Sequence, residues 1–197
     1  MTAAIAAITF ALSVARLAMF IAVHFSRSGY NPVRHAVSDY AVGKTRALSS
    51  AMTWTSAGMW AALALAVGIG LPEWEDTTFV VVCLTVLALV FLVMPLLPTD
   101  LEGTPATRIG RLHLLAAILW FALSYACMGN FVRLMHQGFV GTLLSILSWV
   151  SLISLIALVA ALVIRPLRSW AFGISERVFI LSVSLFYTFV ALQIVLW

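Results

Sequence analysis

The side chains best suited to chemistry follow the first apolar run of the sequence, in a polar stretch between positions 31 and 43. Within this stretch a histidine and an aspartate lie four residues apart, and they share one face if Pro32 begins a short helix. Such a pair can bind a metal ion, or the carboxylate can orient an imidazole that acts as a general base. Two later residues would add a second carboxylate and a second imidazole. We therefore predict as catalytic candidates His35, Ser38, Asp39, Asp100 and His113.

Other interpretations of these residues stay open. A network of salt bridges and helix caps at a membrane interface would use the same residue types. Ser38 could act as a nucleophile, but the Gly-x-Ser-x-Gly turn is missing, and Ser38 or Asp39 is better suited to cap the next helix. No tight ligand motif such as His-Glu-x-x-His occurs, so the metal is left unassigned. His24 and His113 could instead approach from two helices and ligate a haem.

Arg16 is the charge placed deepest in an apolar run. A charge in that position costs at least about 2.5–3.5 kcal/mol unless it is paired or reaches the interface. The guanidinium either faces the neighbouring helices and meets Asp39, Asp100 or a lipid phosphate, or extends to the inner headgroups. Together with charged residues near the same membrane face, it gives the predicted substrate-binding set: Arg16, Arg108, Arg111, Glu176 and Arg177.

The composition requires a lipid environment for the elements that position these residues. The chain has 197 residues, of which 63% are hydrophobic and 9% charged, and its mean hydropathy is +1.11. A soluble domain has about a quarter of its residues charged. The formal charge of +4 does not indicate nucleic-acid binding, because the basic residues lie between apolar runs. Cys83 and Cys127 fall inside apolar runs and are interpreted as small core residues.

Six runs are long enough to cross a membrane as helices, since about 20 apolar residues are needed. No basic start of a signal peptide is present, so the first run is expected to be kept as a span. The sequence predicts an all-α, polytopic membrane protein, a bundle of six transmembrane helices in a single domain over residues 1–197. Its spans are Ala3–His24, Ser49–Leu71, Phe79–Leu97, Leu112–Met135, Val140–Ile164 and Arg177–Trp197.

Basic residues predict the orientation of this bundle. Nine lysines and arginines flank the spans on one side: Arg27, Arg34, Lys44, Arg46, Arg108, Arg111, Arg165, Arg168 and Arg177. The other side has only Arg133, and its first loop is acidic. The positive-inside rule places the nine in the cytoplasm and both termini on the non-cytoplasmic side. Ser175 is predicted to cap the sixth span, with Glu176 in its first turn.

Three segments carry a resemblance to a known family: Arg34–Gly43, with Ser38-Asp39-Tyr40 at its centre, then Leu97–Asp100 and Thr107–His113. They resemble the bacterial domain-of-unknown-function family 998 of multi-span membrane proteins, which is distantly similar to the Frag/DRAM/PGAP group. That resemblance implies Ser38, Asp39, Asp100 and His113 as the family-type positions. It also implies a bacterial inner (plasma) membrane location and favours lipid as the ligand.

Two functions of different kinds are consistent with these observations. The first is a protein that binds or modifies a lipid headgroup through the polar cluster at the cytoplasmic face, with membrane lipids as partners. The second is a non-enzymatic accessory or scaffold subunit that packs against a partner membrane protein. A small transporter is less well supported, because repeats and broken helices are missing. Whether the chain is an enzyme and which cofactor it uses, if any, stay open.

Overall fold

A computed structural model describes residues 1–26, 29–101 and 104–197; Arg27, which entered the charge count above, lies outside these ranges. The described residues form helices and turns without a strand. The long helices are α1 (Thr2–Phe25), α2 (Arg46–Gly70), α3 (Thr77–Val93), α4 (Arg108–Leu134), α5 (Gly138–Val163) and α6 (Arg165–Leu196). Three short 3-10 helices join them: η1 (Val37–Ala41), η2 (Gly43–Thr45) and η3 (Met94–Leu96). The predicted all-α class is confirmed.

All six long helices are long and apolar enough to cross a membrane. A helix satisfies its own backbone hydrogen bonds, so it is the expected form for an apolar segment in lipid. The outward faces carry large exposed apolar side chains, such as Leu89 on α3 and Ile153 on α5. Six apolar helices with apolar outward faces make the chain a multi-pass membrane protein. Lipid then covers these exposed side chains.

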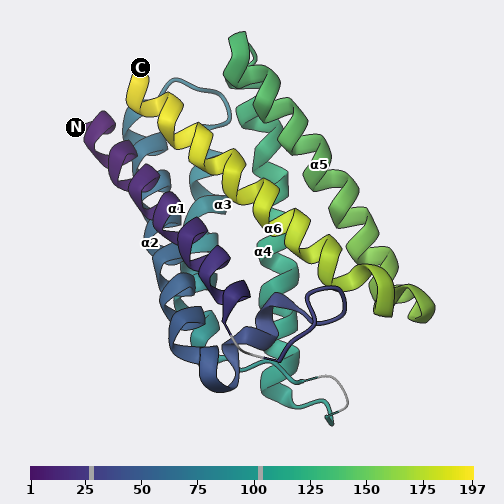
Figure 1. Cartoon of the computed structure of the whole chain (residues 1–197). Helices are drawn as coiled ribbons and strands as arrows, with labels where there is room; N and C mark the ends of the chain where they lie inside the picture. Colours follow the sequence, from purple (N-terminus) through teal and green to yellow (C-terminus); the bar gives the residue numbers. More distant parts are fainter. Residues whose placement is uncertain (27–28, 102–103) are drawn as a thin grey trace.

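The helices form a closed bundle in which α6 has a central place (Figure 1). Helix α6 packs against α1 and α5, α1 packs against α2, and α3 and α4 complete the circuit between α2 and α5. Tyr187 of α6 lies at the centre of the core, where its ring contacts Trp60 of α2 at 4.6 Å between centroids. Its hydroxyl donates to the Ser124 carbonyl of α4 at 2.6 Å. Cys83 and Cys127 are buried in the same core.

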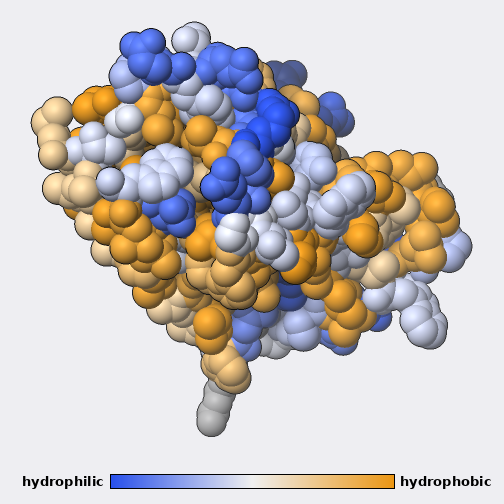
Figure 2. Space-filling model, turned by 90° about the horizontal axis from the view of Figure 1, so that it is seen from above, coloured by the Kyte–Doolittle hydropathy of each residue, from blue (hydrophilic) through white to orange (hydrophobic). Residues whose placement is uncertain are grey.

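Both termini lie at one end of the bundle (Figure 1), as an even number of spans requires. This end carries the acidic loop with Glu73 and Glu75, and Asp76 forms an ion pair with Arg133 at 2.9 Å. Figure 2 looks onto this end, where hydrophilic side chains gather in one area among apolar ones. We call the opposite end the arginine-rich end, after Arg34, Arg46, Arg111 and Arg168.

The sixth helix begins earlier than the sequence prediction placed it. Helix α6 starts at Arg165, with Pro166 in its first turn, where the missing N–H of proline does no harm. The predicted start at Arg177 and the predicted cap at Ser175 are therefore wrong. Ser175 and Glu176 lie inside the helix and are both buried. The sequence did not reveal this start, because Arg165, Arg168 and Arg177 interrupt the apolar run.

Candidate functional site

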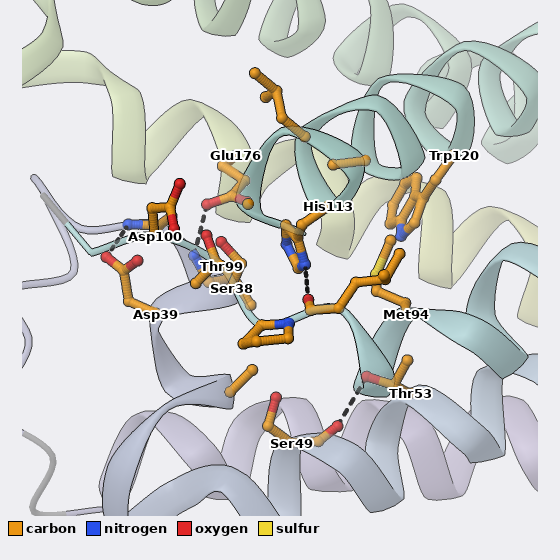
Figure 3. A pocket seen from close by; sticks show the side chains of 18 of the residues that line it. Ser38, Asp39, Ser49, Thr53, Met94, Thr99, Asp100, His113, Trp120 and Glu176 are labelled. Carbon is orange, nitrogen blue, oxygen red and sulfur yellow. Dashed lines mark hydrogen bonds between the residues drawn. The ribbon is translucent and has the colours of Figure 1, made fainter. Parts of the chain in front are cut away.

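A cavity of about 570 Å³ opens at the arginine-rich end. Its walls come from the loop before α2, from α2, α4 and α6, and from the segment that follows α3 (Figure 3). Eight of the ten predicted site residues line it: Arg16, His35, Ser38, Asp39, Asp100, Arg111, His113 and Glu176. The fold thus brings together residues from four distant parts of the sequence. Of the other two predicted residues, Arg108 is exposed at the start of α4, and neither it nor Arg177 is among the lining residues.

The loop that forms one wall is held against α6 by its backbone. The Gly173 N–H donates to the Val33 carbonyl at 3.0 Å. A Cβ at Gly173 would lie 2.5–2.8 Å from the carbonyl oxygens of Pro32, Val33 and His35, so only glycine permits this approach. Arg177 reinforces the contact, because one terminal N–H donates to the His35 carbonyl at 2.7 Å. Arg177 therefore positions the loop.

Asp39 and Glu176 are two buried carboxylates that meet on this wall. The Ala36 N–H donates to Asp39 Oδ2 at 3.0 Å, so Asp39 caps the short helix η1. The next N–H, of Val37, donates to Glu176 Oε2 at 2.6 Å. The two carboxylates thus accept hydrogen bonds from consecutive backbone amides.

His35 and Asp39 do not lie in one helix. Pro32 begins a turn, so the condition under which the two would share one helix face is not met. The His35 ring accepts from the Asn31 N–H at 2.8 Å through Nδ1, whereas Asp39 lies in η1. The predicted cap on the following long helix is also wrong, because α2 begins at Arg46 after Thr45.

His113 lies on α4 between the carboxylates and the aromatic side of the cavity (Figure 3). Its Nδ1–H donates to the Leu97 carbonyl at 2.7 Å. A carbonyl oxygen can only accept, so Nδ1 carries the proton and Nε2 of the neutral ring carries the lone pair. The charges of Asp39 and Asp100 both act on this ring. Such an imidazole can accept a proton from a ligand.

Asp100 lines the cavity and holds Thr107, the N-cap residue of α4. Its two carboxylate oxygens accept from the N–H and the hydroxyl of Thr107, both at 2.8 Å. Thr107 in turn accepts from the Gly110 N–H at 2.9 Å. The hydrogen bonds from Thr107 lower the pKa of Asp100, the backbone N–H first, and the positive charge of Arg111 adds to this. Asp100 is therefore a stable anion at the helix N-terminus.

Arg16 lies at the inner end of the cavity and is 5% exposed. Its Nε–H donates to Ser56 of α2 at 2.9 Å, and one terminal N–H donates to Ser184 of α6. Within residues 1–26, 29–101 and 104–197, no carboxylate lies within ion-pair distance of Arg16. The predicted partners Asp39 and Asp100 are engaged elsewhere, as described above.

Several site residues were missed because their types are common in apolar helices. Ser49, Thr53 and Ser56 recur on one face of α2 and line the cavity. Arg34, Arg46 and Arg168 join Arg111 in the lining as exposed residues of the arginine-rich end. The hydroxyl residues of α2 are spaced by three or four positions, and this spacing could have indicated a polar helix face.

The sequence left both metal and haem ligation open. In the part of the chain that the structure describes, no group of three or more His, Cys, Asp or Glu is arranged to hold a metal ion. Both ring nitrogens of His24 are engaged: Nδ1 donates to the Phe20 carbonyl, and Nε2 accepts from Arg177 Nε at 2.8 Å. His24 therefore has no nitrogen free for a haem iron in this arrangement.

The six apolar helices and the cavity at one end define a polytopic, all-helical membrane protein. More particularly, the chain belongs to the family described as "Protein of unknown function (DUF998)", whose model matches residues 4–193. The predicted family is confirmed. No curated protein and no solved structure matches the chain.

Proposed function

We propose that the protein binds the headgroup of a membrane phospholipid in the cavity at its arginine-rich end. One observation carries this proposal: a single cavity is lined both by exposed arginines and by exposed apolar side chains of membrane-spanning helices. A site for a water-soluble ligand does not need the exposed apolar side chains. A gap with a purely structural role does not need the exposed arginines. The volume of about 570 Å³ suits part of a lipid.

The arginines would hold the phosphate. Arg34, Arg46, Arg111 and Arg168 come from four different segments and line the same cavity. Guanidinium groups bind phosphate oxygens through paired, charge-assisted hydrogen bonds. Arg108 would attract an anionic surface without touching the bound lipid, because it lies outside the lining.

The acyl chains would leave the cavity sideways. Leu114 and Ile118 of α4 and Leu162 of α5 line the cavity, and they are 51%, 50% and 43% exposed. In the proposal, the gap beside these exposed side chains of α4 and α5 opens towards the bilayer. A lipid could therefore keep its chains in the bilayer while its headgroup occupies the polar part of the cavity.

The polar wall would contact the headgroup beyond the phosphate. His113 offers its Nε2 lone pair, and the buried carboxylates of Asp39 and Glu176 lie nearby. In the proposal, His113 Nε2 accepts a hydrogen bond or a proton from a hydroxyl or ammonium group of the bound headgroup. The charge distribution supports a cytoplasmic location for this end, in the inner membrane of a bacterium.

Mass spectrometry of lipids retained after purification in detergent tests the proposal. We expect about one phospholipid per chain, and about tenfold or greater loss of it in the double variant Arg46→Gln/Arg111→Gln. Each charge-assisted hydrogen bond is worth about 1.5–3 kcal/mol, and about 1.4 kcal/mol is a tenfold change in affinity.

Arg108→Gln and Arg133→Gln are the matched controls, because both residues are exposed and neither lines the cavity. Both should retain lipid as the unchanged protein does. Equal retention by the double variant would disprove the proposal. Co-elution of a second membrane protein without bound phospholipid would favour the scaffold function instead.

A further inference from the structure

The inner end of the cavity holds a buried positive charge whose hydrogen bonds are only partly used. Arg16 has five N–H groups, and two of them donate to the hydroxyls of Ser56 and Ser184. Among the residues that the structure describes, the other three have no acceptor. Both serine hydroxyls donate their own protons to helix carbonyls, those of Met52 and Ile180. The serines therefore orient the guanidinium without neutralising it.

This charge lies far from the arginines at the cavity mouth. Arg16 contacts Ser56 of α2, which follows Arg46 at the start of that helix by about 15 Å of helix rise. Beside the hydroxyls of Thr53 and Ser56 of α2, the cavity lining includes large apolar side chains: Phe91 of α3, Trp120 of α4 and Ile180 of α6. A phosphate held at the mouth would not reach Arg16, so this end is a separate subsite.

The charge balance of the subsite specifies its ligand. A charge without a counter-ion in an apolar interior is costly, and a bound anion removes that cost. One guanidinium balances one negative charge, which a carboxylate or a phosphate diester carries, whereas a phosphate monoester would bring close to two. The planar fork of the guanidinium matches the two oxygens of a carboxylate. The surrounding rings match a hydrophobic body attached to it.

We propose that Arg16, oriented by Ser56 and Ser184, binds the carboxylate of a hydrophobic monocarboxylic acid at the inner end of the cavity. The acid can come from the bilayer, as a fatty acid whose chain leaves past Leu114, Ile118 and Leu162. It can also come from the aqueous side, as a shorter hydrophobic acid. This subsite goes beyond the proposed headgroup site and does not depend on it.

The test measures equilibrium binding of radiolabelled oleate to the delipidated full-length protein in detergent, with unlabelled competitors. We expect saturable binding of about one oleate per chain. Arg16→Met should weaken this binding at least tenfold, and Ser184→Ala should weaken it less. Arg16→Met removes a buried charge at nearly constant length, so it should fold, and its melting temperature without ligand should be equal or higher.

The variants and competitors separate this inference from the headgroup proposal. Arg46→Gln/Arg111→Gln should lose phospholipid and keep oleate binding, whereas Arg16→Met should do the reverse. Competition by hexanoate or benzoate as strong as that by unlabelled oleate would support the carboxylate subsite with an aqueous source. Competition by inorganic phosphate stronger than by the carboxylates, or unchanged oleate binding in Arg16→Met, would overturn the inference.

Discussion

At the scale of single residues, Gly110 determines whether Asp100 can cap α4. A Cβ at this position would lie 2.0 Å from Asp100 Oδ2, so the carboxylate would have to move. Glycine to alanine inside a helix ordinarily stabilises by about 1 kcal/mol. We expect the opposite sign for Gly110→Ala, a loss of about 1–2 kcal/mol, because the Asp100–Thr107 cap is lost. Thermal unfolding in detergent measures the difference.

Gly129 provides the control in the same helix. A Cβ there would meet only the end of the Arg133 side chain, at 3.9 Å. Gly129→Ala should therefore leave the protein unchanged or more stable. If Gly110→Ala were equally harmless, the contact between Asp100 and the first turn of α4 would not matter to stability.

Asp100 itself predicts a pH dependence. The hydrogen bonds from Thr107 lower its pKa in the folded protein. Because the folded pKa is below the unfolded value of about 4, the stabilisation is present above that value and is lost as the pH falls through the folded pKa. Melting temperatures measured from pH 7 down to pH 3 should fall more steeply for the unchanged protein than for Asp100→Asn.

The control for Asp100→Asn removes an exposed carboxylate that takes no part in the cap of α4. Glu73 is exposed in the loop at the opposite end. Glu73→Gln should keep the full acid sensitivity of the unchanged protein. A curve for Asp100→Asn that coincides with that of Glu73→Gln at every pH would contradict the role given to this carboxylate.

At the scale of the elements, Gly173 holds the loop of residues 31–36 on α6. Gly173→Ala would place a methyl group against three backbone carbonyls, which cannot rotate away as a side chain can. We expect the loop to detach from α6. The hydrogen bond from the Val37 N–H to Glu176 would then be lost. Limited trypsin digestion should then cut faster after Arg34, which is exposed. Gly68→Ala is the matched control, since its Cβ would meet Val81 at an ordinary 3.5 Å; unchanged cleavage in Gly173→Ala would refute the idea.

The sequence predicted elements better than contacts, and the reason is physical. Continuous apolar runs define membrane helices, so five of the six predicted spans begin and end within a few residues of the observed helices. The same topology predicted that Asp39, Asp100 and His113 would gather at one end, and all three line one cavity. The partners of Arg16 could not be predicted, because serines are common in apolar helices and only helix rotation selects Ser56 and Ser184. The role of Gly173 depends on a loop docking onto a helix 140 residues away in sequence, which no local pattern encodes.

At the scale of the whole molecule, the proposed function depends on which side of the membrane the cavity faces. The bundle has an acidic end with both termini and an arginine-rich end with the cavity (Figure 1). The positive-inside rule predicts that the cavity faces the cytoplasm. Lys44 and Glu73 are exposed near opposite ends, so each can report the side on which its end lies.

Cysteine labelling in intact cells therefore decides the orientation. The native Cys83 and Cys127 are buried and should not react with a membrane-impermeant maleimide, which gives a clean background. We expect Glu73→Cys to label in intact cells, and Lys44→Cys to label only after the membrane is permeabilised. The reverse pattern would place the cavity on the outer face. The cavity would then take its lipid from the outer leaflet. The positive-inside rule would no longer explain the four arginines at its mouth, so headgroup binding alone would have to explain them.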